Sequence, residues 1–284
     1  MSIDKFEKQR FQDAIDAGNS FEKLIRKFQQ VFYSALSDFI VGFDTENGNL
    51  KATAKNTGRL GGIFKIFRSI QPDYQEQALS EIQDWTGKFL ESNKGYFAAM
   101  DLGGQSADEY ARWYALWSWG YDVKTGKLVE GGYLSGLFNN QQIAQRVGAA
   151  INSAILQKMS LQEFQIAFRK IFVGNIGQGM LERHWKTNSF DLFQRIDRAA
   201  NFAYAEQFGL TWAIYSGTLM ADSRPFCIER VNKVFNRDQI ASWSDLEFQG
   251  KPKIGYNPFM DCGGFNCRHH LSWISEPLAK KLLK

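Results

Sequence analysis

The residues best suited to metal chemistry lie near the C-terminus of the chain. All three cysteines lie beyond residue 226, and Cys262, Cys267, His269 and His270 stand within the short run DCGGFNCRHH. Three thiolates and one imidazole can complete a closed tetrahedral zinc site. The sequence therefore predicts a zinc site formed by Cys227, Cys262, Cys267 and His269. If the run is extended there, His270 points to the opposite face from His269 and is the poorer ligand.

The spacing of these residues leaves an alternative open. No C-x-x-C pair is present, and the spacer between Cys227 and Cys262 is longer than that of a typical zinc finger. In a cytoplasm, cysteines stay reduced or bind metal more often than they form disulfides. Three reduced cysteines in a small core therefore remain the alternative to a metal site.

The sequence gives little support to an enzyme. It lacks the His-x-Glu of zinc deaminases, the H-E-x-x-H of metalloprotease helices and a Walker A run. Cys267 beside His269 or His270 is not evidence of a nucleophile and its base, since neighbours on a strand point to opposite faces. We expect a protein that is not an enzyme and has no small-molecule substrate.

One segment concentrates positive charge, although the whole chain carries a formal charge of only +4. Its five cations are unbroken by any acid, which suits a sequence-independent contact with phosphates or with another acidic partner. A solvated stretch is the alternative. The five residues are Lys51, Lys55, Arg59, Lys65 and Arg68.

The sequence indicates neither a signal peptide nor a membrane-spanning helix. No charged n-region followed by an apolar stretch opens the chain. No apolar run reaches the roughly 18 residues needed to span a bilayer. We expect no membrane association and folding in a cytoplasm.

Helical periodicity dominates the first three quarters of the chain, where apolar residues recur at spacings of three and four. We expect a first helix that stops just before Asn19, and a second that opens with a capping box of Asn19 and Glu22. Ser160 and Glu163 predict another capped helix start. The run 121–133, with Lys-Thr-Gly near its middle, predicts a short hairpin.

The character of the sequence changes after Gly209, where Trp212 and Ile214 alternate with smaller or polar residues and predict a strand. The predicted fold is mainly α. It consists of a long multi-helix N-terminal domain (residues 1–208) with a short hairpin, followed by a small Cys/His-containing α+β module (residues 209–284).

An aromatic stripe, Tyr110, Trp113, Tyr114 and Trp117, invites comparison with the platforms on which nucleic-acid bases stack. Its helical spacing favours core or helix–helix packing instead.

Two segments of the module resemble a known family. The run DSRPFC (residues 222–227) follows the predicted strand, and CGGFNCR (residues 262–268) follows a spacer. Together they resemble the minor head, or head morphogenesis, proteins of tailed phages, the Mu F-like family. That family shows a D-x-R segment with a following Cys or His, and a terminal H-P-N-C-R-C. The residues that match these motifs, apart from the cysteines, are Asp222, Arg224, Asn266 and Arg268.

The resemblance covers residues 138 to 275 and includes departures. The His-Pro of the family is Gly-Phe here, and His269 replaces its last cysteine, which keeps a metal ligand at that position. Arg198 is followed by Ala-Ala where the family tends to show Thr-Glu, so a local ion pair with Arg198 is not expected.

The resemblance implies a structural virion protein of a tailed phage. Such a minor head protein is associated with the portal vertex and acts in head morphogenesis and in DNA packaging or ejection. Its partners would be portal and capsid proteins and packaged DNA, and it would reside in the virion after assembly in the host cytoplasm. A zinc-dependent nuclease or toxin-like effector, and a DNA-binding accessory factor, are the alternatives.

Overall fold

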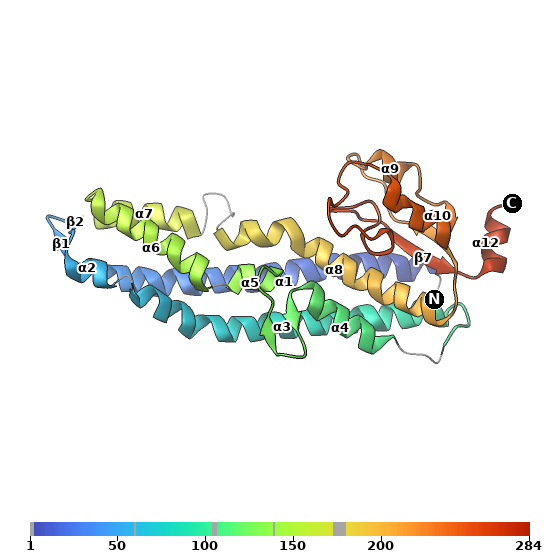
Figure 1. The fold of residues 1–284 in the computed structure, drawn as a ribbon, viewed down its shortest axis with the longest axis horizontal. Helices are drawn as coiled ribbons and strands as arrows, with labels where there is room; N and C mark the ends of the chain where they lie inside the picture. The colour runs from blue at the N-terminus through green and yellow to red at the C-terminus, as the bar shows by residue number, and fades with distance from the viewer. Residues whose placement is uncertain (1–2, 60, 104–106, 139, 173–179) are drawn as a thin grey trace. The chain divides into compact units, whose positions relative to one another are not determined.

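The structure is a computed structural model that describes residues 3–59, 61–103, 107–138, 140–172 and 180–284. Long helices account for most of these residues, and short helices and strands follow residue 207 (Figure 1). The predicted fold class, mainly α with a small α+β module at the C-terminus, is confirmed. No helix in the described ranges is both long enough and apolar enough to cross a membrane.

The long helices are α1 (Ile3–Val41), α3 (Gly61–Ala98), α4 (Asp108–Ser118), α6 (Asn140–Leu156), α7 (Leu161–Phe172) and α8 (Met180–Gln207). The short ones are α2 (Ala54–Arg59), α5 (Tyr133–Phe138), α9 (Pro225–Ile228), α10 (Arg237–Ala241), the 3-10 helix η1 (Ser242–Asp245), α11 (Pro258–Asp261) and α12 (Glu276–Leu282). The strands are β1 (Thr45–Glu46), β2 (Asn49–Leu50), β3 (Tyr121–Asp122), β4 (Lys127–Leu128), β5 (Trp212–Ser216), β6 (Val234–Asn236) and β7 (His270–Ile274).

The chain divides into two compact units. The first unit comprises Met1–Gly18, Ile82–Ser118 and Ser189–Lys284, and the second comprises Asn19–Glu81 and Trp119–Asn188. Helix gives way to strand near residue 209 as predicted, but the packing does not separate residues 1–208 from 209–284. Because one face of a small sheet must be covered by another element, the C-terminal residues share a core with helical segments from earlier in the chain.

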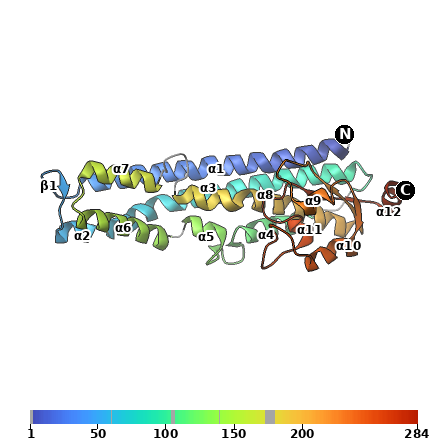
Figure 2. The ribbon, with the colours of Figure 1, turned by 90° about the horizontal axis from the view of Figure 1, so that it is seen from above.

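The sheet of the first unit has the strand order β6-β5-β7 and is antiparallel throughout. The central strand pairs Ala213 with Phe235 on one side and with Trp273 on the other. Views from two sides show this sheet and its short helices alongside the C-terminal part of α8 (Figures 1 and 2). The hydroxyl of Tyr96, on α3, donates to the carbonyl oxygen of Trp273 at 2.8 Å and so ties the sheet to the helices.

A buried ion pair joins two helices within the first unit. Arg10, on α1, donates from Nε and Nη2 to the carboxylate of Asp197, on α8, at 2.9 and 2.8 Å. The side-chain amide of Asn93, on α3, donates to the same carboxylate at 3.0 Å. Both charged groups are almost fully buried, so they stabilise the fold only as a matched pair.

The second unit has an aromatic core. The ring of Phe28 lies with its centroid 5.1 Å from Tyr74, 5.9 Å from Phe67 and 5.5 Å from Phe138. At one end, the β1–β2 hairpin lies beside the start of α7, and the main chains of Asn49 and Ser160 form a bridge (Figure 2).

The local sequence patterns predicted some of the helix ends and turns correctly. The predicted capping box at Ser160 is confirmed, since its hydroxyl accepts from the Glu163 amide and the Glu163 carboxylate accepts from the Ser160 amide. The predicted hairpin is also present as β3 and β4. The helix end before Asn19 was wrong, because α1 runs unbroken from residue 3 to 41. A glycine inside a helix costs only about 1 kcal/mol, which packing on a long apolar face outweighs.

The aromatic stripe on α4 packs less completely than its spacing predicted. Tyr114 is buried, but Tyr110, Trp113 and Trp117 are each about half exposed. The rings of Trp113 and Trp117 stack on each other with centroids 5.9 Å apart. The helix buries the adjacent face, which carries Ala111, and leaves the stripe at the surface.

Candidate metal centre

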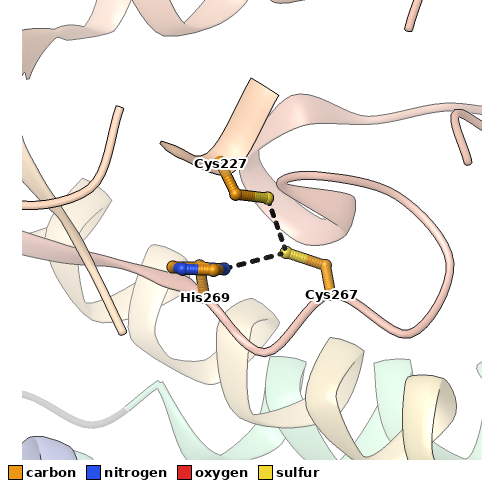
Figure 3. Close-up of side chains that lie close together, drawn as sticks. All are labelled: Cys227, Cys267 and His269. Atoms are coloured by element: carbon orange, nitrogen blue, oxygen red, sulfur yellow. Dashed lines mark hydrogen bonds between the residues drawn. The ribbon is translucent and has the colours of Figure 1, made fainter. Parts of the chain in front are cut away.

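Three of the four predicted ligands lie together in the first unit. Cys227 lies on α9, and Cys267 and His269 lie in the loop between α11 and β7 (Figure 3). The sulfurs of Cys227 and Cys267 are 4.0 Å apart, and Nδ1 of His269 is 3.7 Å from the sulfur of Cys267. All three ligand atoms lie within 4.8 Å of one another, and all three residues are buried. We call this group the Cys–Cys–His site.

The geometry of the Cys–Cys–His site fits a metal ion. Tetrahedral zinc with Zn–S bonds near 2.3 Å and Zn–N bonds near 2.0 Å separates two sulfurs by roughly 3.8 Å and a sulfur from a nitrogen by roughly 3.5 Å. The corresponding distances here, 4.0 and 3.7 Å, differ from these by a few tenths of an ångström. The cysteines are not joined in a disulfide. The three residues could therefore hold a metal ion with little rearrangement.

Cys262 does not belong to the group, so this part of the predicted ligand set was wrong. The residue ends α11 with a positive φ of 49°, and the chain turns there. The turn brings the next residue, Gly263, against the sulfurs. A Cβ atom on Gly263 would lie 2.5 Å from the sulfur of Cys227 and 3.0 Å from that of Cys267. The site is therefore lined by the bare backbone of Gly263 and not by the thiol of Cys262.

Hydrogen-bond donors surround the two sulfurs. The amide of Gly263 donates to the sulfur of Cys267 at 3.2 Å. The hydroxyl of Tyr215 lies 3.4 Å from the sulfur of Cys227 and 3.5 Å from that of Cys267. Its ring stacks on that of His269 with centroids 5.1 Å apart. Such donors stabilise thiolates and orient metal ligands.

The two thiols of the site differ in acidity. Burial by itself would raise the pKa of Cys267, but hydrogen bonds with Cys227 and His269 and the charge of Arg198 outweigh it and hold that pKa well below its usual value. The hydrogen bond with Cys267 and burial raise the pKa of Cys227. Cys267 is therefore the more acidic thiol of the two, and a metal ion would displace the protons that the thiols carry.

Arg198 holds the second ligand segment in place, a role that the sequence did not reveal. Its guanidinium, buried on α8, donates to the carbonyl oxygens of Met260 at 3.0 Å and of Cys267 and His269 at 2.6 Å each. Every residue has a main-chain carbonyl group, so hydrogen bonds to carbonyl oxygens leave no pattern in the sequence. The sequence therefore gave no hint of these contacts of Arg198.

Arg224 joins the two segments that carry the family resemblance. It donates from Nη1 to the carbonyl oxygen of Gly263 at 3.0 Å and from Nη2 to that of Phe265 at 2.6 Å. In the second segment, Asn266 adopts a positive φ of 55°, and its main-chain N–H donates to the carboxylate of Asp191 at 2.7 Å.

The other two motif residues, Asp222 and Arg268, are exposed. Asp222 forms no hydrogen bond or ion pair with any residue that the structure describes. A cavity of about 200 Å³ adjoins the Cys–Cys–His site. Its lining includes all three members of the site together with Asp222, Arg224 and Arg268.

His270 faces away from the site, as predicted. It is buried at the start of β7 and lines a different cavity of about 340 Å³, together with Lys8 and Arg268. Burial, together with the charges of Arg10 and Arg198, holds the pKa of His270 well below its usual value. It is therefore neutral at physiological pH.

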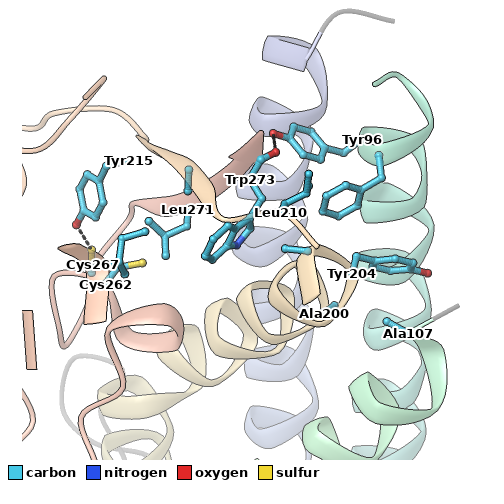
Figure 4. Packing of buried hydrophobic residues seen from close by; sticks show 14 of the residues in the cluster. Tyr96, Ala107, Ala200, Tyr204, Leu210, Tyr215, Cys262, Cys267, Leu271 and Trp273 are labelled. Atoms are coloured by element: carbon cyan, nitrogen blue, oxygen red, sulfur yellow. Dashed lines mark hydrogen bonds between the residues drawn. The ribbon is translucent and has the colours of Figure 1, made fainter. Parts of the chain in front are cut away.

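An apolar cluster of the first unit extends from the site toward the helices. Figure 4 shows Cys267 and Cys262 at one end of this cluster and Tyr204 and Ala107 at the other, with Trp273 between them. The site is therefore continuous with the core that anchors the sheet.

The basic segment lies in the second unit, and acids from outside the segment reach part of it. Lys51 pairs with Glu46 at 3.3 Å, and Lys55 pairs with Asp44 at 2.7 Å. All four side chains are at least one third exposed, so these pairs contribute little to stability.

The remaining cations of the segment have different surroundings. Arg59 donates to the carbonyl oxygen of Phe39 at 3.2 Å and lies over the rings of Phe39 and Phe43. Lys65 and Arg68, on α3, are exposed and have no ion-pair partner among the residues that the structure describes. Of the five cations, these two are the most available to a partner.

Comparisons with protein-family models, with curated proteins and with solved structures found no match to this chain. The assignment of a function therefore rests on the motif residues and on the geometry that brings them together.

Proposed function

We propose that this chain is a minor head protein of a tailed phage, a structural component of the virion and not an enzyme. It would associate with portal and capsid proteins at the portal vertex and act in head morphogenesis and in DNA packaging or ejection. The observation that carries this proposal is that the two segments resembling the Mu F-like family lie together. Arg224 links them, and they meet at the Cys–Cys–His site.

The metal that suits this site is zinc. Thiolate and imidazole ligands favour zinc over the oxygen-preferring cations, and the separations from the Cys267 sulfur to the other two ligand atoms are close to those around a tetrahedral ion. A bound ion would tie residues 222–227 to residues 262–269 and add its binding free energy to that of folding. Cys227, Cys267 and His269 would hold the ion, and the amide of Gly263 and the hydroxyl of Tyr215 would support their orientation.

Lys65 and Arg68 are the residues that we assign to contact with an acidic portal surface or packaged DNA. They are exposed and free of intramolecular ion pairs among the described residues. Two cations can neutralise two phosphates or carboxylates, which supports a modest and salt-sensitive contact.

One observation favours a second candidate, a zinc-dependent nuclease or toxin-like effector. All three members of the Cys–Cys–His site line a cavity, and a catalytic metal needs an open coordination position of that kind. Asp222 is the one carboxylate among the described residues of the lining, so it would have to act as the general base.

The composition of purified virions tests the proposed function. Quantitative mass spectrometry should find the chain in a small fixed ratio to the portal protein, both in complete virions and in heads emptied of DNA. Cross-links between this chain and the portal protein should form in the same particles. If the chain is abundant in the lysate but missing from washed virions, the proposal fails and the effector becomes the leading candidate.

A further inference from the structure

We propose that the carboxylate of Asp222 supplies the fourth ligand of the metal ion at the Cys–Cys–His site. This inference rests on the metal site proposed above and goes beyond it, because it assigns a ligand and closes the coordination sphere.

The fourth ligand has to approach from the cavity. Three protein atoms occupy three of the four tetrahedral positions. Gly263 and Tyr215, which do not line the cavity, lie against the sulfurs, at distances that leave no room for a Cβ atom on Gly263. The cavity reaches all three members of the site and therefore offers a fourth ligand an approach to the ion.

The two nearest alternatives to Asp222 within the protein are poor ligands. The ring of Tyr215 stacks on that of His269, and its hydroxyl lies 3.4 and 3.5 Å from the two sulfurs, so Tyr215 serves as a hydrogen-bond partner of the ligands. Cys262 is fully buried and, unlike Asp222, does not line the cavity.

The location of Asp222 suits the fourth coordination position of the metal ion. It lines the same cavity as the three ligands, is exposed and has no partner among the described residues. Its segment is fixed on both sides. Ser223 closes a turn with Met220, with its hydroxyl 2.7 Å from the Met220 amide, and Arg224 is bound to the second ligand segment. The proposal requires only that the Asp222 side chain rotate toward the ion while this segment keeps its place.

The charges around the cavity suit this arrangement. Two thiolates, one carboxylate and one neutral imidazole around a divalent cation leave a net charge of −1. Arg224 and Arg268 line the same cavity and offset that charge. The completed site has no open position, as expected of a metal that fixes structure.

Cobalt(II) bound to the full-length protein tests the assignment, because its visible spectrum reports the geometry and the ligands of the ion. The variants are Asp222→Asn, Asp222→Ala and Cys262→Ser. Asp245→Asn is the matched control, since Asp245 is an exposed acid of the same unit that does not line the cavity. Far-UV circular dichroism and a melting curve of each variant establish that it folds.

The wild type, Asp245→Asn and Cys262→Ser should bind cobalt with the same affinity and the tetrahedral spectrum of two thiolates. Both Asp222 variants should bind at least about tenfold more weakly, with shifted visible bands. Added azide should change the spectrum of the Asp222 variants at far lower concentrations than that of the wild type, because it enters the vacated position.

Three outcomes would overturn the assignment. If Asp222→Asn matches the wild type in affinity and in its response to azide, an external ligand fills the position, and the metal site survives without Asp222. If Cys262→Ser lowers the thiolate absorbance by about a third while Asp222→Asn does not matter, Cys262 is the fourth ligand. If the folded wild type binds neither cobalt nor zinc, the metal site itself is wrong and the inference falls with it.

Discussion

The two units of this chain bury different kinds of side chain. The first unit encloses charged and polar groups, among them Arg10, Asp197, Arg198 and His269. In the second unit, the buried polar side chains among the described residues are Gln29 and Asn56, and the core is otherwise apolar and rich in phenylalanine. The units therefore depend on different physical terms. The stability of the second unit depends on close packing of apolar side chains. The stability of the first unit depends on each buried charge and hydrogen-bond donor having a partner.

This difference explains where a site can form. An apolar core tolerates exchange of one hydrocarbon for another of similar volume, but it offers no ligands. The first unit holds Arg198 against the carbonyl oxygens around Cys267 and His269, and this fixes the ligand loop to α8. Burying these polar groups costs stability, but it places the ligand loop precisely, as a metal site requires.

The largest expected effect comes from the buried ion pair of the first unit. Asp197→Asn preserves volume but leaves the charge of Arg10 buried without a counter-charge, which should cost about 3–5 kcal/mol in the free energy of unfolding. Urea denaturation followed by circular dichroism measures the loss. The double variant Arg10→Met with Asp197→Leu should recover much of it, because no charge then remains buried.

The matched change in the second unit is Leu36→Met, at a fully buried position of α1. A volume-conserving exchange of this kind should cost less than about 1.5 kcal/mol. Equal losses for Leu36→Met and Asp197→Asn would remove the contrast between the two units.

Arg59 should matter more for stability than any other cation of the basic segment. Arg59→Ala removes a hydrogen bond to Phe39 and the packing of the guanidinium over the rings of Phe39 and Phe43. We expect a loss of about 1–2 kcal/mol. Thermal unfolding measures it, and Lys65→Ala serves as the exposed control that should leave the midpoint unchanged.

The first unit should also show a pH dependence that originates at Asp191. Burial raises the pKa of Asp191 to about 6, although the charge of Arg198 and the hydrogen bond from Asn266 oppose the shift. Because the folded pKa lies above the unfolded one, this contribution to stability is present below about pH 4 and is lost as the pH rises toward 6. Asp191→Asn should raise stability at pH 7 by about 1 kcal/mol, after allowance for partial exposure.

Stability curves measured between pH 4 and 7 test the assignment of this slope. The Asp191→Asn curve should be flatter than that of the wild type over this range. Parallel curves for the two proteins would mean that a group other than Asp191 causes the pH dependence of stability.

The smallest effect on stability belongs to Lys65 and Arg68. Exchanging both for Gln should change the free energy of unfolding by less than about 0.5 kcal/mol, since both are exposed. It should nevertheless weaken association with an acidic partner and flatten the salt dependence of that association. The pair Lys51→Gln and Lys55→Gln is the control, because those lysines already have acidic neighbours. If the two pairs behave alike, the segment is a solvated surface.

Local patterns in the sequence predicted local structure well. Three–four spacing predicted the helices, alternation after Gly209 predicted β5, and Ser160 with Glu163 predicted a capped start. What the patterns missed was long-range. The unbroken course of α1 past Asn19 depends on packing, and the partner of Arg10 lies 187 residues away in the sequence. Such contacts leave no local signal.

The candidate site shows the same limit. Residue type identified Cys227, Cys267 and His269, because few side chains can bind a soft metal ion. Residue type could not exclude Cys262, whose thiol is kept outside the group by a left-handed backbone turn. It was equally unable to reveal Arg198, since a guanidinium that binds carbonyl oxygens depends only on where the backbone passes.

The zinc content of the purified protein tests the central claim most directly. Elemental analysis of protein prepared without chelator should find about one zinc per chain, bound by the three residues of the Cys–Cys–His site. Cys227→Ser and Cys267→Ser should lose the metal, and Cys262→Ser should retain it. A folded wild type without zinc, or a Cys262→Ser variant that loses zinc as completely as the other two, would contradict the site described above.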